Sequence, residues 1–430
     1  MKKSFFLLFA LFGFTLSSCD YLNGFLSSLA GDFFPTSSEG EASSSSSSLE
    51  ESSEIEISSS SLSYVEGEMA SVSIHFLELG NQYTGDCIYI KAGENDILID
   101  AGSRKGSAAT IAAYLQDGTR GGDYVSDGKL EYVIATHAHQ DHIAGFVGNK
   151  KGETRDGIMY QFKVDNLIDF SYYDTGSKVF DNTKVTYEES DGLTQIYEDY
   201  LDARNFLIAS GTNWKTAGQL FEEGTTVFPL GPGVELDLLY NFFYDHTSAD
   251  VKELEPGFSK SGFSNQNDCS VSVLLRQGSR SFLFTGDSEE YAEHSLVKYN
   301  DLPEVDLFKC GHHGSYTASG EELLSAIKPK SVVACCCAGN DEYASDPKHS
   351  FPAQEAIDRI AEYTDDFYVT TLGSWDDGSH YEPMNGNVVF AYDRSGALAK
   401  SFSHNDLKLK DTAWFKENRE CPDPWKEETA

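Results

Sequence analysis

Three histidines and an aspartate stand within six residues of one another, in the segment Thr136-His137-Ala138-His139-Gln140-Asp141-His142. An apolar, strand-like run precedes them, so a loop at a strand end can aim His137 and His139 at one cation. Asp141 and His142 follow on the next turn and can reach a second cation nearby. Imidazole nitrogens and carboxylate oxygens bind zinc at roughly 2.0 to 2.2 Å. The spacing therefore predicts a metal centre rather than a histidine-rich surface loop.

Two further strand-like runs end in candidate metal ligands. One run leads into Thr285-Gly286-Asp287, whose carboxylate could bridge two cations. Gly-Asp at the end of a strand more often forms a turn than a metal site. Asp287 is therefore a candidate ligand mainly because the histidine cluster is also present. The other run leads into Gly311-His312-His313-Gly314-Ser315. We expect one histidine of this pair to complete the second cation's ligands and the other to donate a proton to a leaving group.

The surrounding pattern predicts the elements that must position these motifs. Short apolar runs bounded by Gly, Asn or Asp are expected strands, and longer runs with suitable starts are expected helices. The expected strands are Val72–Leu79, Cys87–Lys91, Asp96–Asp100, Tyr132–Ala135, Ser272–Arg276, Ser281–Thr285, Glu304–Cys310 and Ser331–Cys337. The expected helices are Ala108–Leu115, Leu193–Phe206, Glu289–Tyr299, Glu321–Ile327 and Pro352–Tyr363. This order predicts an α/β fold of two mixed sheets covered by helices.

The N-terminal residues carry an export pattern. Lys2 and Lys3, an apolar run and small residues before Cys19 are typical of a signal peptide in residues 1–18. Leu16-Ser17-Ser18-Cys19 resembles a bacterial lipobox, which would lipidate Cys19; a plain signal peptide is the alternative. Residues 19–70 are dominated by Ser and Glu, so we expect a disordered tether. The expected location is the outer face of the bacterial cytoplasmic membrane.

Charge and cysteine usage limit the function classes. The formal net charge is −37, from 32 basic and 69 acidic residues. Because the part after residue 70 is itself strongly acidic, extended nucleic acid is a disfavoured but not excluded partner. Cys335 to Cys337 lie in an apolar run and lack metal-type spacing, so we expect buried side chains rather than ligands. After the signal no apolar run reaches 18 residues, which disfavours a membrane channel.

Together with Asp96-Ile97-Leu98-Ile99-Asp100-Ala101-Gly102, the three motifs resemble the metallo-β-lactamase superfamily. In particular they are similar to the hydrolase domain of ComEC-like DNA-uptake competence proteins and their free-standing relatives. Further similar segments are Ile74–Gly80, Gly85–Ile88, Asn267–Ser270 and Thr370–Gly373. The resemblance implies an αββα sandwich over residues 71–403, with a lid or rim at 150–260 where it is thin, and a tail at 404–430.

The resemblance also implies two divalent cations, zinc by default and manganese as the alternative. The implied ligands are His137 and His139 for the first, Asp141, His142 and His312 for the second, and Asp287 between them. His312 aligns better than His313 with the ligand histidine of glyoxalase-type relatives. His313 is then the proton donor, and Asp141 also holds the attacking oxygen.

Other positions have supporting roles or depart from the family pattern. Asp100 is expected to support the site from below, and His349 and Asn267 are candidate substrate contacts. The superfamily's additional histidine before the Asp287 strand has no clear match, because His246 stands in a different context. We therefore expect the first cation to have few protein ligands.

These observations predict an extracytoplasmic, metal-dependent hydrolase. The first hypothesis is a phosphodiesterase or nuclease-like enzyme that uses a metal-activated hydroxide, with the acidic charge favouring a small phosphoester over DNA. A lactone or β-lactam hydrolase is the nearest alternative. The alternative from another class is a catalytically inactive surface lipoprotein that binds a ligand through aromatic residues such as Tyr172, Tyr173 and Trp214.

Overall fold

The structure is a computed structural model that describes residues 68–116, 124–152, 154–175, 178–185, 192–247, 250, 266–342, 346–374 and 379–426. The expected signal peptide, Cys19 and nearly all of the expected tether lie outside these residues. Within the described residues, no helix combines the length and the apolar character that a membrane span requires.

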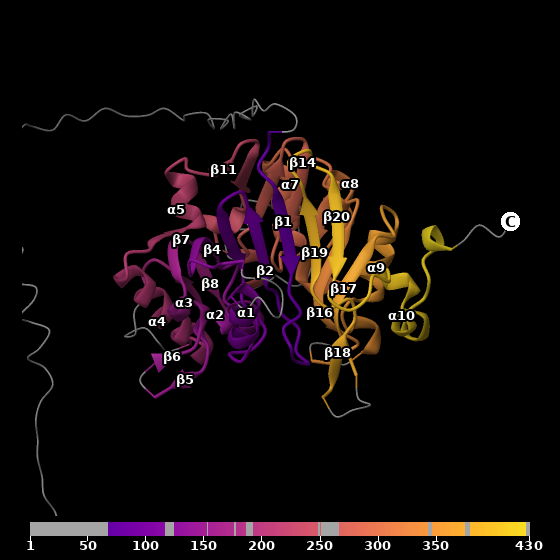
Figure 1. Cartoon of the computed structure of the whole chain (residues 1–430), viewed down its shortest axis with the longest axis horizontal. Coiled ribbons are helices and arrows are strands. Elements are labelled where there is room, and N and C mark those ends of the chain that lie inside the picture. The colour runs from indigo at the N-terminus through magenta and orange to yellow at the C-terminus, as the bar shows by residue number, and fades with distance from the viewer. Residues whose placement is uncertain are drawn as a thin grey trace, which may run out of the picture. The chain divides into compact units, whose positions relative to one another are not determined.

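The first of two large sheets has the strand order β10-β7-β4-β3-β2-β1-β19-β20 (Figure 1). Its strands are β1 Val72–Phe76, β2 Ile88–Ala92, β3 Asn95–Ile99, β4 Lys129–Ile134, β7 Lys163–Asp169, β10 Asn213–Thr216, β19 Val388–Tyr392 and β20 Leu398–Phe402. The neighbours β3, β4, β7 and β10 run parallel, and the remaining neighbours run antiparallel.

The second sheet has the order β11-β12-β13-β14-β15-β16-β17-β18. Its strands are β11 Val227–Gly231, β12 Val234–Leu238, β13 Val273–Gln277, β14 Arg280–Phe284, β15 Leu307–Lys309, β16 Val332–Ala338, β17 Phe367–Gly373 and β18 Tyr381–Pro383. The four strands β14 to β17 run parallel. The predicted fold class, α/β with two mixed sheets, is therefore confirmed.

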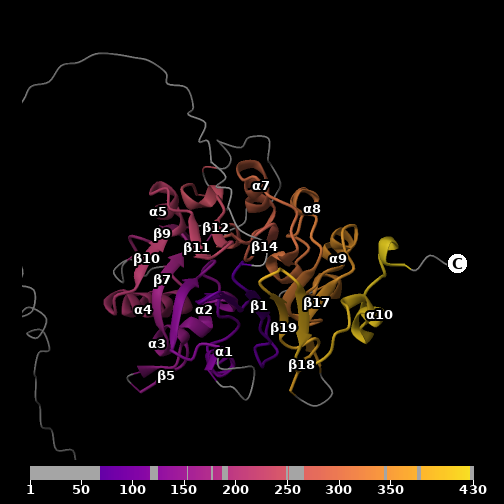
Figure 2. The ribbon, with the colours of Figure 1, turned by 45° about the horizontal axis from the view of Figure 1, so that its top comes forward.

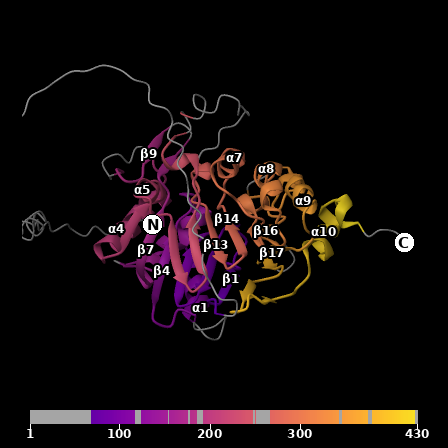
Figure 3. The same cartoon turned by 90° about the horizontal axis from the view of Figure 1, so that it is seen from above.

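Helices cover the outer faces of both sheets. Phe76 of β1 and Phe284 of β14 pack against each other in the core between the sheets, with ring centroids 6.4 Å apart. Residues of α1 Ser107–Gln116, α2 Gln140–Val147, α3 Ile158–Gln161 and α4 Gln195–Ala209 belong to that same core cluster. Residues of α7 Glu290–Tyr299, α8 Glu321–Ile327 and α9 Gln354–Ala361 pack with β15 to β17 in a second cluster. In Figures 2 and 3, α4 lies on one side of the strands and α8 and α9 on the opposite side.

Residues 150–260 differ from the expected lid or rim. Their described part supplies four strands of the framework, β7 and β10 of the first sheet and β11 and β12 of the second. It also forms the hairpin of β8 Tyr172–Asp174 and β9 Val179–Asp181, and α5 Ala217–Glu222. The strand pattern is weak because β10 and β11 are edge strands with one buried residue each.

The segment after residue 403 packs back on the second sheet's helical side. It contains α10 Ala413–Asn418 and two short 3₁₀ turns, Leu409–Asp411 and Asp423–Trp425. Leu409, Phe415 and Trp425 are buried in the same cluster as α9. The Trp425 indole N–H donates to the Thr364 carbonyl at 2.9 Å. The tail is therefore part of the folded domain.

Gly102 lies in the loop between β3 and α1 and packs against the backbone of α2. A substitution at Gly102 therefore measures how tightly this loop packs on α2. A Cβ atom at Gly102 would lie 1.5 Å from the Asp141 carbonyl oxygen. We expect Gly102→Ala to lower the free energy of unfolding by about 3 kcal/mol, because the backbone of α2 must move. Urea unfolding measures this change.

Gly106 provides the matched control in the same loop, since a Cβ there meets nothing within 4 Å. Gly106→Ala should change the stability by less than about 0.5 kcal/mol. Equal stability of the two variants would show that the contact between the β3 loop and α2 is loose.

Candidate metal centre

The first sheet contributes candidate ligands from the end of β4 and a supporting carboxylate, Asp100, from the end of β3. Residues 135–139 connect β4 to α2, which brings His137, His139, Asp141 and His142 to one edge of the sheet. The loop is fixed by backbone hydrogen bonds, from Ala101 N to His142 O at 2.7 Å and from Asp86 N to Asp141 O at 3.0 Å. All of these side chains except His139 are buried.

The second sheet contributes candidate ligands from the ends of β14 and β15. Gly286 precedes Asp287 with φ +56°, and a Cβ there would lie 2.9 Å from the side chains of Ser270 and Thr136. His312 and His313 both adopt left-handed backbone conformations, with φ of 44° and 57°. Such conformations cost roughly 1 to 3 kcal/mol each for residues with a Cβ and occur mainly where function requires them.

Three buried ligand atoms from both sheets converge on one point, and Asp141 lies beside them. Asp287 Oδ2 lies 3.0 Å from His142 Nε2 and 3.2 Å from His313 Nε2, and the two imidazole nitrogens are 3.3 Å apart. Asp141 Oδ2 is 3.4 Å from His313 Nε2. A tetrahedral ion with bonds near 2.0 Å separates its ligand atoms by about 3.3 Å. The spacing therefore fits a small divalent cation.

A second group of ligand atoms lies beside the first. His137 Nε2 is 3.0 Å from His139 Nδ1 and 3.9 Å from Asp287 Oδ2. Burial, together with the neighbouring imidazoles of His142 and His139, holds the pKa of His137 well below its usual range. Burial also lowers the pKa of His139. Both rings are therefore neutral, which is the form that binds a metal ion.

Two buried carboxylates orient the imidazoles of the convergent group. Asp100 Oδ2 is 2.7 Å from His142 Nδ1, and Asp100 also accepts hydrogen bonds from the backbone N–H and the hydroxyl of Thr136. His313 Nδ1 hydrogen-bonds the Cys335 carbonyl at 2.9 Å, and Asp86 Oδ1 lies 3.0 Å from the same nitrogen. Carboxylates that hold the far nitrogen of a ligand histidine are a common feature of metal sites. Asp100 lies where the sequence placed it, whereas Asp86 had been assigned no role.

Asp86 is better placed as a support than as a ligand. One carboxylate oxygen or imidazole nitrogen from each of Asp86, His142, Asp287 and His313 lies within 4.8 Å of the others. However, Asp86 Oδ2 forms an ion pair with the fully buried Lys309, whose ammonium also lies 3.4 Å from Asp287 Oδ1. Burial opposes this charge, but the two carboxylates raise the pKa of Lys309. A lysine inside a buried strand requires an acidic partner, so Lys309 in the sequence already indicated that a buried carboxylate lies nearby.

The site's carboxylates attract positive charge strongly. Burial would raise the pKa of Asp287, but the charges of His142 and His313 hold it well below its usual range. Conversely, burial would lower the pKa of His142, but Asp287 and Asp100 raise it to about 10. A proton therefore competes with a divalent cation for the His142 imidazole.

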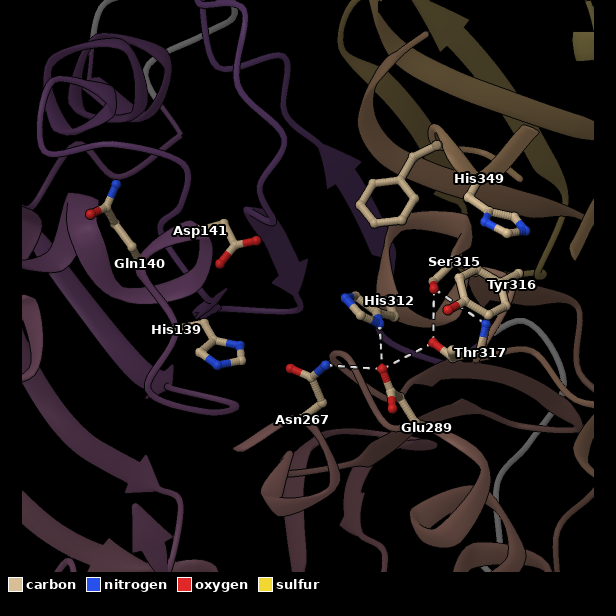
Figure 4. A pocket seen from close by; sticks show the side chains of 11 residues that line it. His139, Gln140, Asp141, Asn267, Glu289, His312, Ser315, Tyr316, Thr317 and His349 are labelled. Atoms are coloured by element: carbon tan, nitrogen blue, oxygen red, sulfur yellow. Dashed lines mark hydrogen bonds and ion pairs between the residues drawn. The ribbon is translucent and has the colours of Figure 1, made fainter. Parts of the chain in front are cut away.

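The centre opens onto a cavity of about 470 Å³ (Figure 4). Its lining residues are His139, Gln140, Asp141, Asn267, Glu289, His312, Ser315, Tyr316, Thr317, His349 and Phe351. The candidate substrate contacts Asn267 and His349 are among them. His246 is not: it forms an ion pair with Asp245 at 2.6 Å and stacks on Phe242.

The histidine pair is arranged in the opposite way to the sequence expectation. His313 points to the ligand atoms, whereas the side chain of His312 is 19% exposed and faces the cavity. His312 Nε2 is 3.7 Å from Asp287 Oδ2, and its Nδ1 is 2.9 Å from Glu289 Oε1. Two successive left-handed residues turn the second histidine inward, and the sequence does not reveal that turn.

Glu289 is a cavity residue that sequence reasoning missed. Its Oε1 accepts hydrogen bonds from Asn267 at 3.1 Å and from Thr317 at 2.9 Å. Burial opposes its ionisation, but the close contact with His312 and the hydrogen bonds from these two donors lower the pKa of Glu289. Its position two residues after Asp287 is the feature of the sequence that could have identified it as a site residue.

Residues 80–151 match the family model of the metallo-beta-lactamase superfamily. The chain is 30% identical over 69 residues to ComE operon protein 3 of Bacillus subtilis and 36% identical over 67 residues to Recombination protein 2 of Haemophilus influenzae. Each stretch covers 16% of this chain, but only 9% and 8% of the respective relatives. The metallo-beta-lactamase fold protein YhfI of Bacillus subtilis has a TM-score of 0.35 and 11% identity, over 70% of this chain and 96% of that protein. The family-model match and the two relatives confirm the predicted resemblance.

Proposed function

We propose that this chain is a metal-dependent phosphodiesterase that acts on a small extracytoplasmic phosphoester. The match of residues 80–151 to the metallo-beta-lactamase family model supports the metal-dependent hydrolase part of this proposal. The observation that carries it is the convergence of His142, His313 and Asp287, with Asp141 next to His313, beside an open cavity. We assign His313, rather than His312, to the metal.

The charges of the centre fit two divalent cations, zinc or manganese. His137 and His139 would bind the first cation. The second would be bound by Asp141, His142 and His313, and Asp287 would contact both cations. When bound, such ions supply a hydroxide nucleophile at neutral pH and neutralise charge on the phosphoryl oxygens. The four buried carboxylates, with the Lys309 ammonium, have a net charge of −3; they belong to Asp86, Asp100, Asp141 and Asp287. Two divalent ions together with one hydroxide have a charge of +3 and would balance it.

His312 and Glu289 are suited to protonate the leaving oxygen. His312 Nδ1 lies 2.9 Å from Glu289 Oε1, a close polar contact outside hydrogen-bond geometry, and its Nε2 lies on the cavity side of the metal ligands, 3.7 Å from Asp287 Oδ2. An imidazole held in this way can donate its Nε2 proton to an alkoxide as the P–O bond breaks. The amide of Asn267 and the hydroxyl of Thr317 support the Glu289 carboxylate from either side.

The cavity favours a small substrate over extended nucleic acid. Among the described residues that line it, none is Lys or Arg, so beyond the proposed metal ions nothing in this part of the lining would neutralise a row of phosphates. The domain's acidic composition acts in the same direction. A single phosphodiester placed at the metals satisfies both constraints.

Hydrolysis of bis(p-nitrophenyl) phosphate by residues 64–430, with metal content determined on the same sample, tests the proposal. We expect metal-dependent turnover that falls at least about 100-fold in Asp287→Ala, together with loss of bound metal, because this carboxylate lies between both ligand groups. The exposed Asp301→Ala is the matched control and should leave both values unchanged. Bound metal without turnover would instead favour carboxylic esters or lactones, and neither metal nor turnover would favour a binding protein.

The role of the His312–Glu289 pair is tested by the acidity of the leaving group. For aryl methyl phosphates, Glu289→Gln should lower kcat about 100-fold when phenol leaves, but less than about 3-fold when p-nitrophenol leaves, since p-nitrophenolate needs no proton. Steady-state kinetics on both substrates measure the difference.

Glu322→Gln is the control, because it removes a similar ion pair, with His294 at 2.9 Å, away from the cavity. It should leave both rates unchanged. An equal loss for the two leaving groups in Glu289→Gln would exclude proton donation through His312.

The extracytoplasmic part of the proposal rests on the residues before position 71. Lipidation at Cys19 would retain the enzyme at the membrane surface, with the Ser/Glu-rich residues as a tether. Fractionation of cells that express the full chain should find it with membranes, and Cys19→Ser should abolish labelling by a lipid precursor. Unlabelled wild-type protein would contradict the anchor while leaving the hydrolase proposal intact.

A further inference from the structure

An aromatic pair forms the part of the cavity wall next to His312. The rings of Tyr316 and His349 stack, with centroids 4.3 Å apart and planes inclined by 27°. Both residues line the cavity and lie side by side in Figure 4. Tyr316 is 48% exposed, which is unusual for a large aromatic side chain beside a buried centre. The outer face of this pair is therefore available to a ligand.

The two loops that carry the pair are held by arginines. Arg359 donates hydrogen bonds to the carbonyls of Tyr316 at 3.0 Å, Ala318 at 2.7 Å and Ser319 at 2.8 Å. Arg419 of the C-terminal segment donates to the carbonyls of Ser350 at 2.7 Å and Pro352 at 3.0 Å. Because these bonds fix the backbone on both sides, little conformational freedom is lost when a ligand binds.

The charges around the Tyr316–His349 pair indicate the charge of the ligand group that fits beside it. The part of the lining that the structure describes contains no lysine or arginine for a second phosphate, and its two carboxylates are engaged, Asp141 with His313 and Glu289 with His312. An uncharged group is therefore the best fit. A tyrosine ring attracts flat aromatic rings through stacking and tolerates differences in their substituents.

We propose that the Tyr316–His349 pair binds a flat, uncharged aromatic ring carried by the phosphoester substrate. The ring stacks on Tyr316 while the phosphoryl group lies at the metal ligands. This inference rests on the proposed phosphoester chemistry, which orients the ligand. A nucleoside base and a simple aryl group share the required chemistry.

Binding of two ligands that differ only in the ring tests the inference without requiring turnover. Isothermal titration calorimetry on the metal-loaded protein compares thymidine 5′-monophosphate with 2-deoxyribose 5-phosphate, which lacks the base. We expect the first to bind about 10-fold more tightly. Tyr316→Ala should remove that difference, whereas Tyr316→Phe, which keeps the ring, should preserve it. Tyr299→Ala, at an exposed tyrosine of α7 outside the cavity lining, is the control.

Equal affinities in the wild-type protein, or an equal weakening of both ligands by Tyr316→Ala, would overturn the inference. Phenyl phosphate identifies the source of the ring: affinity like that of thymidine monophosphate supports any aryl group, and lower affinity supports a heterocyclic base. Ring preference without hydrolysis of any phosphodiester would refute the proposed function alone, and hydrolysis without ring preference would refute this inference alone.

Discussion

The buried carboxylate of Asp287 is the contact on which the two halves of this molecule depend. It lies 3.0 Å from His142 and 3.9 Å from His137 of the first sheet, and 3.2 Å from His313 of its own sheet. With Asp86, Asp100 and Asp141 it places four buried carboxylates close together. Buried charges of one sign are tolerated only when positive charge lies beside them. Lys309 supplies part of that charge, and binding of the proposed cations would supply the rest, which would couple ion binding to folding at this edge of the sandwich.

This requirement explains why the supports are as important as the ligands. Lys309 compensates Asp86, Asp86 contacts the far nitrogen of His313, and Asp100 does the same for His142. Each ring is thereby fixed before an ion arrives. The strained backbone at His312 and His313 is maintained by the same packing. Removing a support would leave a buried charge unpaired, which costs more than the loss of a single hydrogen bond.

Most of the framework could be predicted because the motifs stand at the ends of regular elements. The bounds of α8 agree with the sequence expectation, and the strands before Asp100 and Asp287 agree to within one residue. Two kinds of feature could not be predicted. The inward position of His313 depends on two left-handed residues, and the pairing of Asp86 with Lys309 joins strand ends from different sheets. The edge strands β10 and β11 bury too few side chains to show a pattern.

The hydrogen bonds from Arg419 to the loop that follows His349 place part of the cavity wall under the control of the C-terminal segment. All the residues that would hold metal precede position 314, whereas Arg419 comes about a hundred residues later. A chain shortened before residue 413 would therefore keep every candidate metal ligand while its cavity wall lost these hydrogen bonds.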